Sequence, residues 1–594
     1  MKDKIKHILR SLKIVWQSSR KWSVINAFVI LIKGFLPVCL IYIIKLLVDE
    51  IATSIQNNNN EDFTLYITLF LTGLLFILNA ILTSIGSLIN QKHSYSINDY
   101  IQNIIHSHTT TFSYSSYENV NFQNIFHRAI NESTIRPSRI YYGFIKILQN
   151  CITLLLIAGL LSSLHWFAII TLIITSLPIV ILRLNYSKQL FSLKNNQTEK
   201  ERVVGYYNRL LTGKEYAKEL RIFNLSWLFK NQYENLKDEL RNDQLNLLRR
   251  KTSHEIFLQI FASVSLFLVF GFVTKEAING NISQGTMVMY LLALYRGFGI
   301  LQELLGNITA LLDDGNFLKN LFEFIDYKHP NTKHKTNISF PKTIQKGIFI
   351  ENLSFKYPNS KRKVFNNFNL NINKEETIAL VGANGAGKTT LIKLLCGLYK
   401  PSSGKILIDD INLSDISNES ISQNISVIFQ DFMLYNTTAK ENIWFGDVNK
   451  EMNEEDIKLN AEKAGIKETL EKLPQGFDTK LGTLFKDSEM LSMGEWQRMA
   501  LARSFYNNAQ LIILDEPTSS MDAFTEAQMI ENFDKITKGR TALIVSHRLS
   551  TINLADRVVV IDNNEIAEVG SPKELMANKG VFYEMANATQ RSII

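Results

Sequence analysis

The stretch that decides the fold reads Gly-Ala-Asn-Gly-Ala-Gly-Lys-Thr-Thr and spans Gly382–Thr390. A strand-like apolar run, Thr377–Val381, precedes it, and a helix-like apolar run, Leu391–Leu395, follows it. A glycine-rich loop between a strand and a helix lets backbone N–H groups and a helix N-terminus surround phosphate oxygens. In such a loop Lys388 would reach the β- and γ-phosphates, and the Thr389 hydroxyl would ligate Mg²⁺. The motif predicts an α/β domain that binds a nucleoside triphosphate.

A second motif lies much further along the chain, where residues 511–516 read Leu-Ile-Ile-Leu-Asp-Glu. This is an apolar strand that ends in two adjacent carboxylates, Asp515 and Glu516. A carboxylate suits a Mg²⁺ ion, and a second one beside it can act as a base. Together with the phosphate loop, the pair predicts a protein driven by nucleotide.

The chain has 594 residues, which is too long for one domain. Long apolar runs recur up to about Leu312, whereas the sequence beyond about Asn316 is typical of a soluble α/β domain. We therefore predict an α-helical transmembrane domain over residues 1–315, a linker over 316–345 and an α/β P-loop nucleotide-binding domain over 346–594. The three cysteines suggest no disulfide framework and are interpreted as small buried residues.

Six apolar runs are near or above the length that a bilayer core requires. They are Val24–Val48, Phe63–Ile89, Ile147–Leu164, Phe167–Leu182, Ile256–Val273 and Met287–Leu312. The N-terminus before the first run is basic, which predicts a cytoplasmic location for it in a multi-pass protein of the cell membrane. The formal net charge of +8 is attributed to such membrane-flanking segments, and no nucleic-acid partner is expected.

The connections between the runs differ in length and charge. Asp49–Asp62 lacks Lys and Arg and is expected outside, as is the tight hairpin at Ser162–Trp166. Asn90–Arg139 and Arg183–Glu255 are long and basic, and we predict that they continue the spanning helices into the cytoplasm. Their tips, Tyr117–Ile130 and Gly213–Phe223, are expected to contact the nucleotide domain, because structureless loops of this length are uncommon.

Three charged residues lie inside predicted spans: Lys33, Arg296 and Glu303. A charge in the middle of a spanning helix costs about 2.5–3.5 kcal/mol on insertion scales. Two explanations remain open. The three side chains line a water-filled substrate cavity, or they snorkel to the interface or form an internal ion pair.

Further motifs accompany the phosphate loop in a fixed order. They are Phe-Lys-Tyr-Pro at 355–358, Phe-Gln-Asp at 429–431, Leu-Ser-Met-Gly-Glu at 491–495, Ser-Ser-Met-Asp at 519–522 and Val-Ser-His at 545–547. Their order and spacing closely resemble the ATP-binding cassette. With six preceding spans, the whole chain resembles an ABC exporter half-transporter, in which one membrane domain is fused to one cassette.

The resemblance implies ATP and Mg²⁺ as cofactors and assigns roles to matching positions. Tyr357 would stack on adenine, Asp515 would hold Mg²⁺ with Thr389 and Gln430, and Glu516 would act as the general base. His547 and Lys388 would complete the catalytic set by contacting the γ-phosphate. The nucleotide would also be bound by the rest of the loop, namely Gly382, Asn384, Gly385, Ala386, Gly387 and Thr390.

In this family two cassettes meet head to tail, so the signature element of one subunit covers the ATP held by the other. One cassette per chain therefore implies a two-fold homodimer, with a heterodimer as the open alternative. The residues implied to face the partner's nucleotide are Ser492, Gly494, Glu495 and Asp522.

The signature departs from the family pattern at Met493, which replaces a glycine, and at Glu495, which replaces a glutamine. A side chain at Met493 adds a Cβ where backbone approaches phosphate closely. Hydrolysis is still expected, because the directly catalytic positions match, but it could be slow.

A weaker resemblance concerns the cargo. Asn-Ile-Ser-Val-Ile-Phe-Gln-Asp-Phe at 424–432 and Leu-Leu-Thr-Gly-Lys-Glu at 210–215 resemble bacterial exporters of lantibiotic-type modified peptides. About twenty residues precede the first span, so no peptidase domain is expected there. The expected function is ATP-driven export, by alternating access, of a modified peptide. Flipping of lipid or lipid-linked glycan, multidrug export, and an ATP-gated channel or membrane sensor are the alternatives.

Overall fold

The computed structural model describes residues 2–57, 63–133, 136–163, 166–327, 338–358 and 360–591. It forms two compact units. The first comprises Met1–Thr111 and Asn124–Tyr327, and the second comprises Phe112–Gln123 and Lys328–Ile594. The asparagines at 58–60 and the part of the predicted linker over 328–337 lie outside the described residues.

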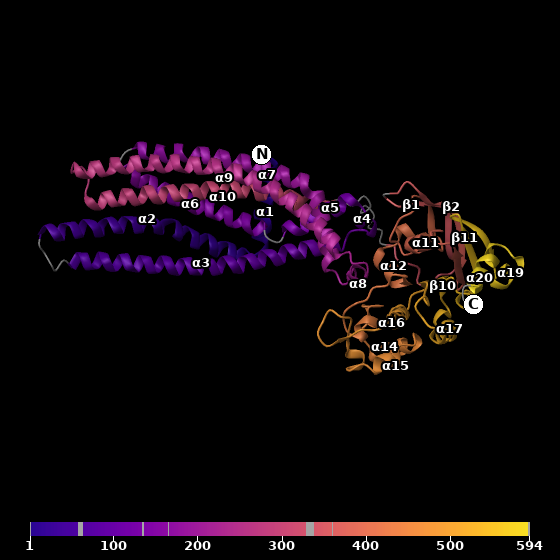
Figure 1. The fold of residues 1–594 in the computed structure, drawn as a ribbon. Coiled ribbons are helices and arrows are strands. Elements are labelled where there is room, and N and C mark those ends of the chain that lie inside the picture. The colour runs from indigo at the N-terminus through magenta and orange to yellow at the C-terminus, as the bar shows by residue number, and fades with distance from the viewer. Residues whose placement is uncertain are drawn as a thin grey trace. The chain divides into compact units, whose positions relative to one another are not determined.

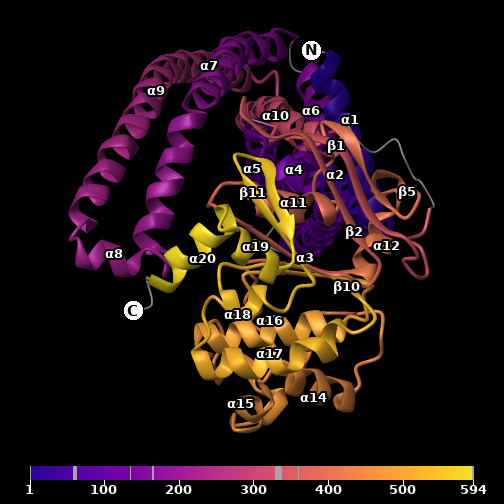
Figure 2. The ribbon, with the colours of Figure 1, turned by 90° about the vertical axis from the view of Figure 1, so that its right-hand side faces the viewer.

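Long helices that run alongside one another build the first unit (Figure 1). Figure 2 shows α7 and α9 side by side, with the short α8 joining their ends. The helices of this unit are α1 Lys2–Ser18, α2 Arg20–Asn57, α3 Phe63–Thr109, α5 Val120–Ser133, whose first turn belongs to the second unit, α6 Arg136–Ser162, α7 Trp166–Thr212, α8 Ala217–Ile222, α9 Ser226–Ile278 and α10 Gln284–Ile325.

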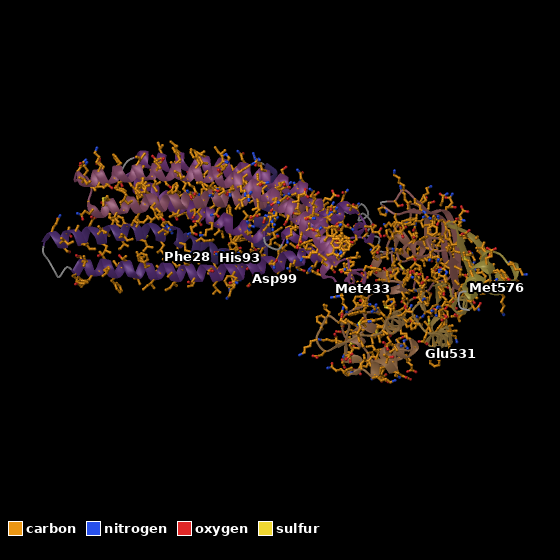
Figure 3. All side chains as sticks on the ribbon, in the orientation of Figure 1. Phe28, His93, Asp99, Met433, Glu531 and Met576 are labelled. Atoms are coloured by element: carbon orange, nitrogen blue, oxygen red, sulfur yellow. The ribbon has the colours of Figure 1, made fainter. Side chains whose placement is uncertain are left out.

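Six of the described helices are long and apolar enough to cross a membrane, which confirms the six predicted spans. They are α2, α3, α6, α7, α9 and α10. Large apolar side chains such as Phe28, which is 65% exposed, project from this unit (Figure 3). Exposed apolar side chains in such numbers suit a hydrocarbon environment, because in water they would oppose folding.

Each of these six helices extends beyond its predicted span at one end or at both. The predicted helical continuations are confirmed, because α3 extends to Thr109 and α7 to Thr212. Two boundaries differ from the expectation. α2 continues to Asn57, so much of the expected loop at Asp49–Asp62 is helical. α10 continues to Ile325 because residues such as Leu321, which is 1% exposed, recur at helical spacing and pack inward. The linker predicted from 316 therefore begins as helix.

The second unit contains three sheets (Figure 1). An antiparallel sheet has the order β2-β1-β4-β5, a mostly parallel sheet has the order β12-β11-β3-β10-β9-β6, and β7 pairs with β8. The strands are β1 Gly347–Lys356, β2 Lys363–Asn373, β3 Thr377–Gly382, β4 Ser403–Ile408, β5 Ile411–Asn412, β6 Ile425–Ile428, β7 Lys480–Leu481, β8 Ser488–Glu489, β9 Leu511–Asp515, β10 Thr541–Val545, β11 Arg557–Asp562 and β12 Glu565–Gly570.

Helices cover this unit's larger sheet on both faces. Successive residues of β9 point to opposite faces, so Ile513 packs in the core with β1 and α11, whereas Ile512 packs in the core with Trp496 of α16. Figure 2 shows α14, α15, α16 and α17 gathered in one helical region. The helices are α4 Tyr114–Tyr117, α11 Lys388–Leu395, α12 Asn418–Asn424, α13 Ala439–Trp444, α14 Glu454–Lys463, α15 Lys467–Glu471, α16 Met493–Tyr506, α17 Ala523–Thr537, α18 Leu549–Ile552, α19 Pro572–Asn578 and α20 Val581–Arg591.

Candidate functional site: the nucleotide cavity

The phosphate loop joins the carboxyl end of β3 to the first turn of α11, as the sequence predicts. Gly387 precedes α11 with φ of +103°, and a Cβ there would lie 2.7 Å from the Phe365 ring. A Cβ on Gly382 would collide with the carbonyl oxygen of Ile561 on the neighbouring β11. Both positions therefore require glycine, one for its backbone conformation and both for space.

Lys388 is the first residue of α11 and is 8% exposed. Its Nζ donates to the carbonyl oxygens of Gly382, at 2.5 Å, and Ala383, at 3.1 Å. Burial lowers the pKa of Lys388, and the carboxylates of Glu516 and Asp515 partly oppose that shift. The ammonium group is thus folded back on its own loop, where it can exchange these carbonyls for phosphate oxygens.

Asp515 ends β9 and is 2% exposed. The Thr389 hydroxyl donates to Asp515 Oδ2 at 3.3 Å. Burial raises the pKa of Asp515 to about 6, although the hydrogen bond from Thr389 opposes the shift. Two oxygen donors at this spacing fit Mg²⁺, which prefers carboxylate, hydroxyl and water ligands. Gln430, the third predicted ligand, lines the same cavity and donates its Nε2 to Glu516.

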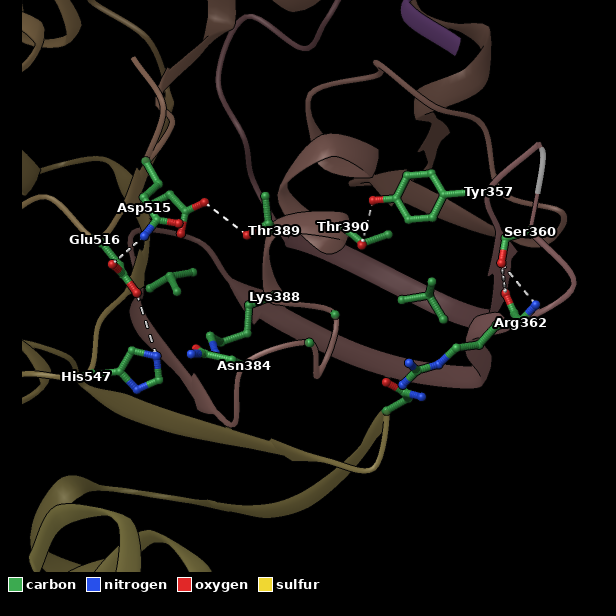
Figure 4. A pocket seen from close by; sticks show the side chains of 16 residues that line it. Tyr357, Ser360, Arg362, Asn384, Lys388, Thr389, Thr390, Asp515, Glu516 and His547 are labelled. Atoms are coloured by element: carbon green, nitrogen blue, oxygen red, sulfur yellow. Dashed lines mark hydrogen bonds and ion pairs between the residues drawn. The ribbon is translucent and has the colours of Figure 1, made fainter. Parts of the chain in front are cut away.

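Glu516 directly follows β9, and its side chain lies between two others. Gln430 Nε2 donates to Glu516 Oε2 at 2.9 Å, and His547 Nε2 lies 3.7 Å from Glu516 Oε1 (Figure 4). Burial lowers the pKa of His547, as does the nearby Lys388, so the imidazole is neutral at physiological pH. A carboxylate and a neutral imidazole side by side can accept a proton from an attacking water and contact a phosphate.

These groups border one cavity of about 650 Å³, which lies within the size range of ligand sites. Of the predicted residues it is lined by Tyr357, Asn384, Gly385, Gly387, Lys388, Thr389, Thr390, Gln430, Asp515, Glu516 and His547. Five further residues that the motifs do not predict also line it, namely Ser360, Arg362, Val364, Val545 and Asn564. Of these, Arg362 could have been predicted from the sequence, because it lies in a basic run shortly after Tyr357. A cation at this place complements the negative charge of a phosphate.

Tyr357 reaches the cavity in an unexpected manner. Its hydroxyl is hydrogen-bonded to Thr390 Oγ1 at 2.9 Å (Figure 4), and its ring packs edge-on against Tyr399 with the centroids 5.3 Å apart. This arrangement fixes the ring through its edge and its hydroxyl. Stacking of Tyr357 on adenine remains a prediction.

Six predicted nucleotide-binding residues do not line the cavity of the described chain. Gly382 and Ala386 belong to the phosphate loop and shape it. At Gly382, for example, any added Cβ would collide with the carbonyl oxygen of Ile561. The others are Ser492, Gly494, Glu495 and Asp522, which lie at or next to the N-terminal ends of α16 and α17.

The two departures in the signature have distinct surroundings. Glu495 forms a capping box with Ser492, in which Glu495 Oε2 accepts from the Ser492 backbone N–H at 2.7 Å and from its hydroxyl at 2.8 Å. Met493 is 58% exposed. The signature serine therefore has its hydroxyl engaged by a carboxylate, next to an exposed apolar side chain.

The first of the two predicted tip contacts is present, shifted toward the N-terminus. Phe112–Gln123 belongs to the same compact unit as the cassette. The Tyr114 ring lies 5.7 Å from that of Tyr399, and Lys393 Nζ lies 5.6 Å from the Tyr114 ring centre. The other tip, Gly213–Phe223, lies in the first unit, and its contact with a cassette remains a prediction.

The surroundings of the three charged residues in the spans fit neither the substrate-cavity explanation nor the explanation by snorkelling or ion pairing completely. Glu303 pairs with Lys146 of α6 at 3.5 Å, so an ion pair exists, but with a partner that the sequence analysis did not single out. Arg296 is exposed in the described chain and Lys33 is partly buried, near Gly86 of α3.

The raised pKa of Asp515 predicts a pH dependence of metal binding. Because the carboxyl is mostly protonated below about pH 6, protons compete with Mg²⁺ there, and the apparent Mg²⁺ affinity in the presence of ATP should fall by up to about tenfold per pH unit. By linkage, a carboxyl whose pKa is raised by folding stabilises the folded, ligand-free cassette while it is protonated. The stabilisation by Asp515 is therefore present at low pH and is lost as the pH rises through about 6. Mg²⁺ titrations of nucleotide binding between about pH 5 and 8 measure the effect. If the apparent Mg²⁺ affinity of Asp515→Asn changed with pH as steeply as that of the wild type, the prediction would be contradicted.

A P-loop cavity on a mostly parallel sheet, in a chain with six potential membrane helices, defines a membrane protein with a nucleotide-binding domain. The family model described as "ABC transporter" matches residues 365–519. The subtilin transport ATP-binding protein of Bacillus subtilis is 29% identical, over 93% of this chain and 89% of that protein. The nisin transport ATP-binding protein of Lactococcus lactis is 28% identical, over 98% of this chain and 96% of that protein.

A candidate multidrug export ATP-binding/permease protein of Staphylococcus aureus is 30% identical, over 81% of this chain and 82% of that protein. A solved structure of a bacterial Atm1-family ABC exporter with ATP bound shares the fold, with a TM-score of 0.80 and 19% identity over 96% of this chain and 98% of that one. The chain therefore belongs to the ABC transporter family, as a membrane domain fused to one cassette. It is a multi-pass transporter ATPase that binds nucleotide, and the predicted fold class is confirmed.

Proposed function

We propose that the protein exports a modified, lantibiotic-type peptide, powered by ATP. The carrying observation is that the subtilin and nisin relatives align over 93% and 98% of this chain, including its membrane half. The cassette alone carries no information on cargo, so similarity across the membrane helices is what supports a shared class of substrate.

In the proposed cycle two copies of the chain form a homodimer in the cell membrane, with the N-terminus and cassettes in the cytoplasm. The position of Ser492 and Gly494 outside the chain's own cavity supports this assembly, because those residues are then available to a second copy's nucleotide. Asp515 and Thr389, aided by Gln430, would hold Mg²⁺, which would offset phosphate charge. ATP-dependent closure of the cassettes opens the membrane cavity outward, and hydrolysis resets it.

Transport into inside-out vesicles tests the proposal. Purified protein is reconstituted with a labelled, lanthionine-containing nisin precursor outside, and ATP-dependent uptake is expected. The unmodified linear precursor and a labelled phospholipid serve as comparisons. Uptake of lipid but of neither peptide would overturn peptide export, while leaving the ATPase assignment intact.

Multidrug export is the second candidate, because the Staphylococcus aureus relative is named for it at 30% identity. The same vesicles distinguish the two functions. A multidrug exporter should move a cationic dye such as ethidium and have its ATPase stimulated by several unrelated amphiphiles, whereas a peptide exporter should respond to the precursor alone.

The signature departures predict a gain of activity. In the proposed dimer Glu495 places a carboxylate, and Met493 a side chain, where a partner's triphosphate approaches. Combining Met493→Gly with Glu495→Gln removes both obstacles while a glutamine can still close the capping box at Ser492. Phosphate release per protomer should rise severalfold, as expected when a like charge near a phosphate is removed. An unchanged rate in the double variant would show that the signature does not limit hydrolysis.

A further inference from the structure

The loop that follows β9 carries the predicted general base in a strained backbone conformation. Glu516 has φ of +51°, in the left-handed region that residues other than glycine seldom adopt. Its backbone N–H donates to Val545 O at 2.8 Å, which ties it to the neighbouring β10. Such a conformation costs of the order of 1–3 kcal/mol and persists only where surrounding contacts enforce it.

A side chain from a different element adds further contacts to the one with Val545. The amide of Gln497, in the second turn of α16, donates through Nε2 to the carbonyl oxygen of Glu516 at 2.9 Å and to Ser519 Oγ at 3.2 Å. Its Oε1 accepts from the backbone N–H of Ser520 at 3.0 Å. Both polar atoms of a single amide thus bind the two ends of the loop over residues 516–520.

The surroundings make this bridge rigid. Gln497 is 2% exposed, so its amide has no water to exchange with and depends on these partners. The first turn of α16 also touches the loop directly, since a Cβ on Gly494 would lie 2.8 Å from the Ser520 carbonyl oxygen. Helix α16 and the loop therefore behave as one packed body at this point.

We propose that Gln497 is a positioning residue for ATP hydrolysis, which acts by holding the backbone of Glu516. Gln497 does not line the nucleotide cavity of the described chain. It contacts the catalytic carboxylate's own main chain, and through it sets where the carboxylate meets Gln430 and His547. A displacement of about 1 Å in a reacting group can cost on the order of a hundredfold in rate. This inference rests on the proposed role of Glu516 and deepens it.

The test separates positioning from stability. Gln497→Met keeps the volume and removes the bridge, and Gln497→Glu is nearly isosteric but replaces the donor to the Glu516 carbonyl by an acceptor. We expect kcat for ATP to fall about ten- to a hundredfold in both, with the affinity for a fluorescent ATP analogue within about twofold of wild type.

The matched control is Gln510→Met. The Gln510 amide likewise bridges backbone groups, accepting from Ile344 N at 2.7 Å and donating to Pro341 O at 2.7 Å, but these partners lie outside the loop over residues 516–520. This variant should lower the thermal midpoint while leaving kcat within about twofold of wild type.

A double-variant cycle completes the experiment. If Gln497 acts through Glu516, then Gln497→Met should reduce the residual activity of Glu516→Gln by less than about twofold, because the group being positioned is already lost. The positioning role would be overturned if Gln497→Met lowered kcat by the same factor in the wild type and in Glu516→Gln. A wild-type kcat in both Gln497 variants would overturn it as well. A wild type without ATPase activity would instead overturn the function itself.

Discussion

Glu516→Gln should slow phosphate release by about 10²–10⁴-fold, the usual contribution of a general base. Glu516 is the one carboxylate in the cavity that accepts from Gln430 and faces His547, whereas Asp515 is turned to Thr389. The substitution keeps the shape of the side chain and removes its capacity to take a proton. Affinity for a fluorescent ATP analogue should therefore stay within a few fold of wild type. Malachite-green phosphate assays in nanodiscs measure the rate.

Glu376→Gln provides the matched control. Glu376 is a carboxylate paired with Arg557 at 2.6 Å, and it does not line the cavity, so its loss should leave the ATPase rate nearly unchanged. The Glu516→Gln variant also tests the alternative of an ATP-gated channel or sensor. Peptide transport in vesicles that continues at the wild-type rate in Glu516→Gln would refute a pump driven by hydrolysis.

The second large effect is expected from Lys388→Ala, which should weaken ATP binding by at least tenfold and prevent closure of the cassettes. Hydrogen bonds to a charged group contribute about 1.5–3 kcal/mol each, and Lys388 is the buried cation of the phosphate loop. Equilibrium binding of the ATP analogue measures the first effect. Distances between spin labels at Lys573→Cys in two copies of the chain measure the second.

Two companion variants make the Lys388 result interpretable. Lys388→Met preserves the packing of the buried stem and should behave like the alanine variant, because the lost group is the charge. Lys405→Met removes a lysine paired with Glu351 at 3.0 Å, outside the cavity, and should bind ATP normally. ATP-induced shortening of the label distance in Lys388→Ala would contradict the assigned role.

Much of the architecture follows from local patterns. The phosphate loop lies between β3 and α11 as predicted, since apolar runs of those lengths on either side of glycines favour that arrangement. The six spans are visible because a bilayer requires long uncharged runs. Their ends were less predictable. α10 extends to Ile325 because buried contacts at Leu321 and Phe322 stabilise a helix beyond the uncharged run.

The site shows the same division. The chain brings Lys388, Asp515, Glu516 and His547 to one cavity, in agreement with motifs that lie at the carboxyl ends of β3, β9 and β10. Ser492 and its neighbours are part of the same motif set but lie elsewhere, on α16. The motifs themselves do not indicate which of them border the same cavity, because that depends on how segments far apart in the sequence pack together.

The order and spacing of residues along the chain thus determined the kind of protein, its nucleotide-binding domain and its membrane half. Only the tertiary structure placed Gln497 beneath Glu516, the Glu495 carboxylate on Ser492 and the Tyr357 hydroxyl on Thr390. The physical reason is range. Periodicity and backbone-driven motifs arise from neighbours a few residues apart, whereas the geometry of a side-chain hydrogen bond depends on helices and strands that meet only after the whole domain has packed.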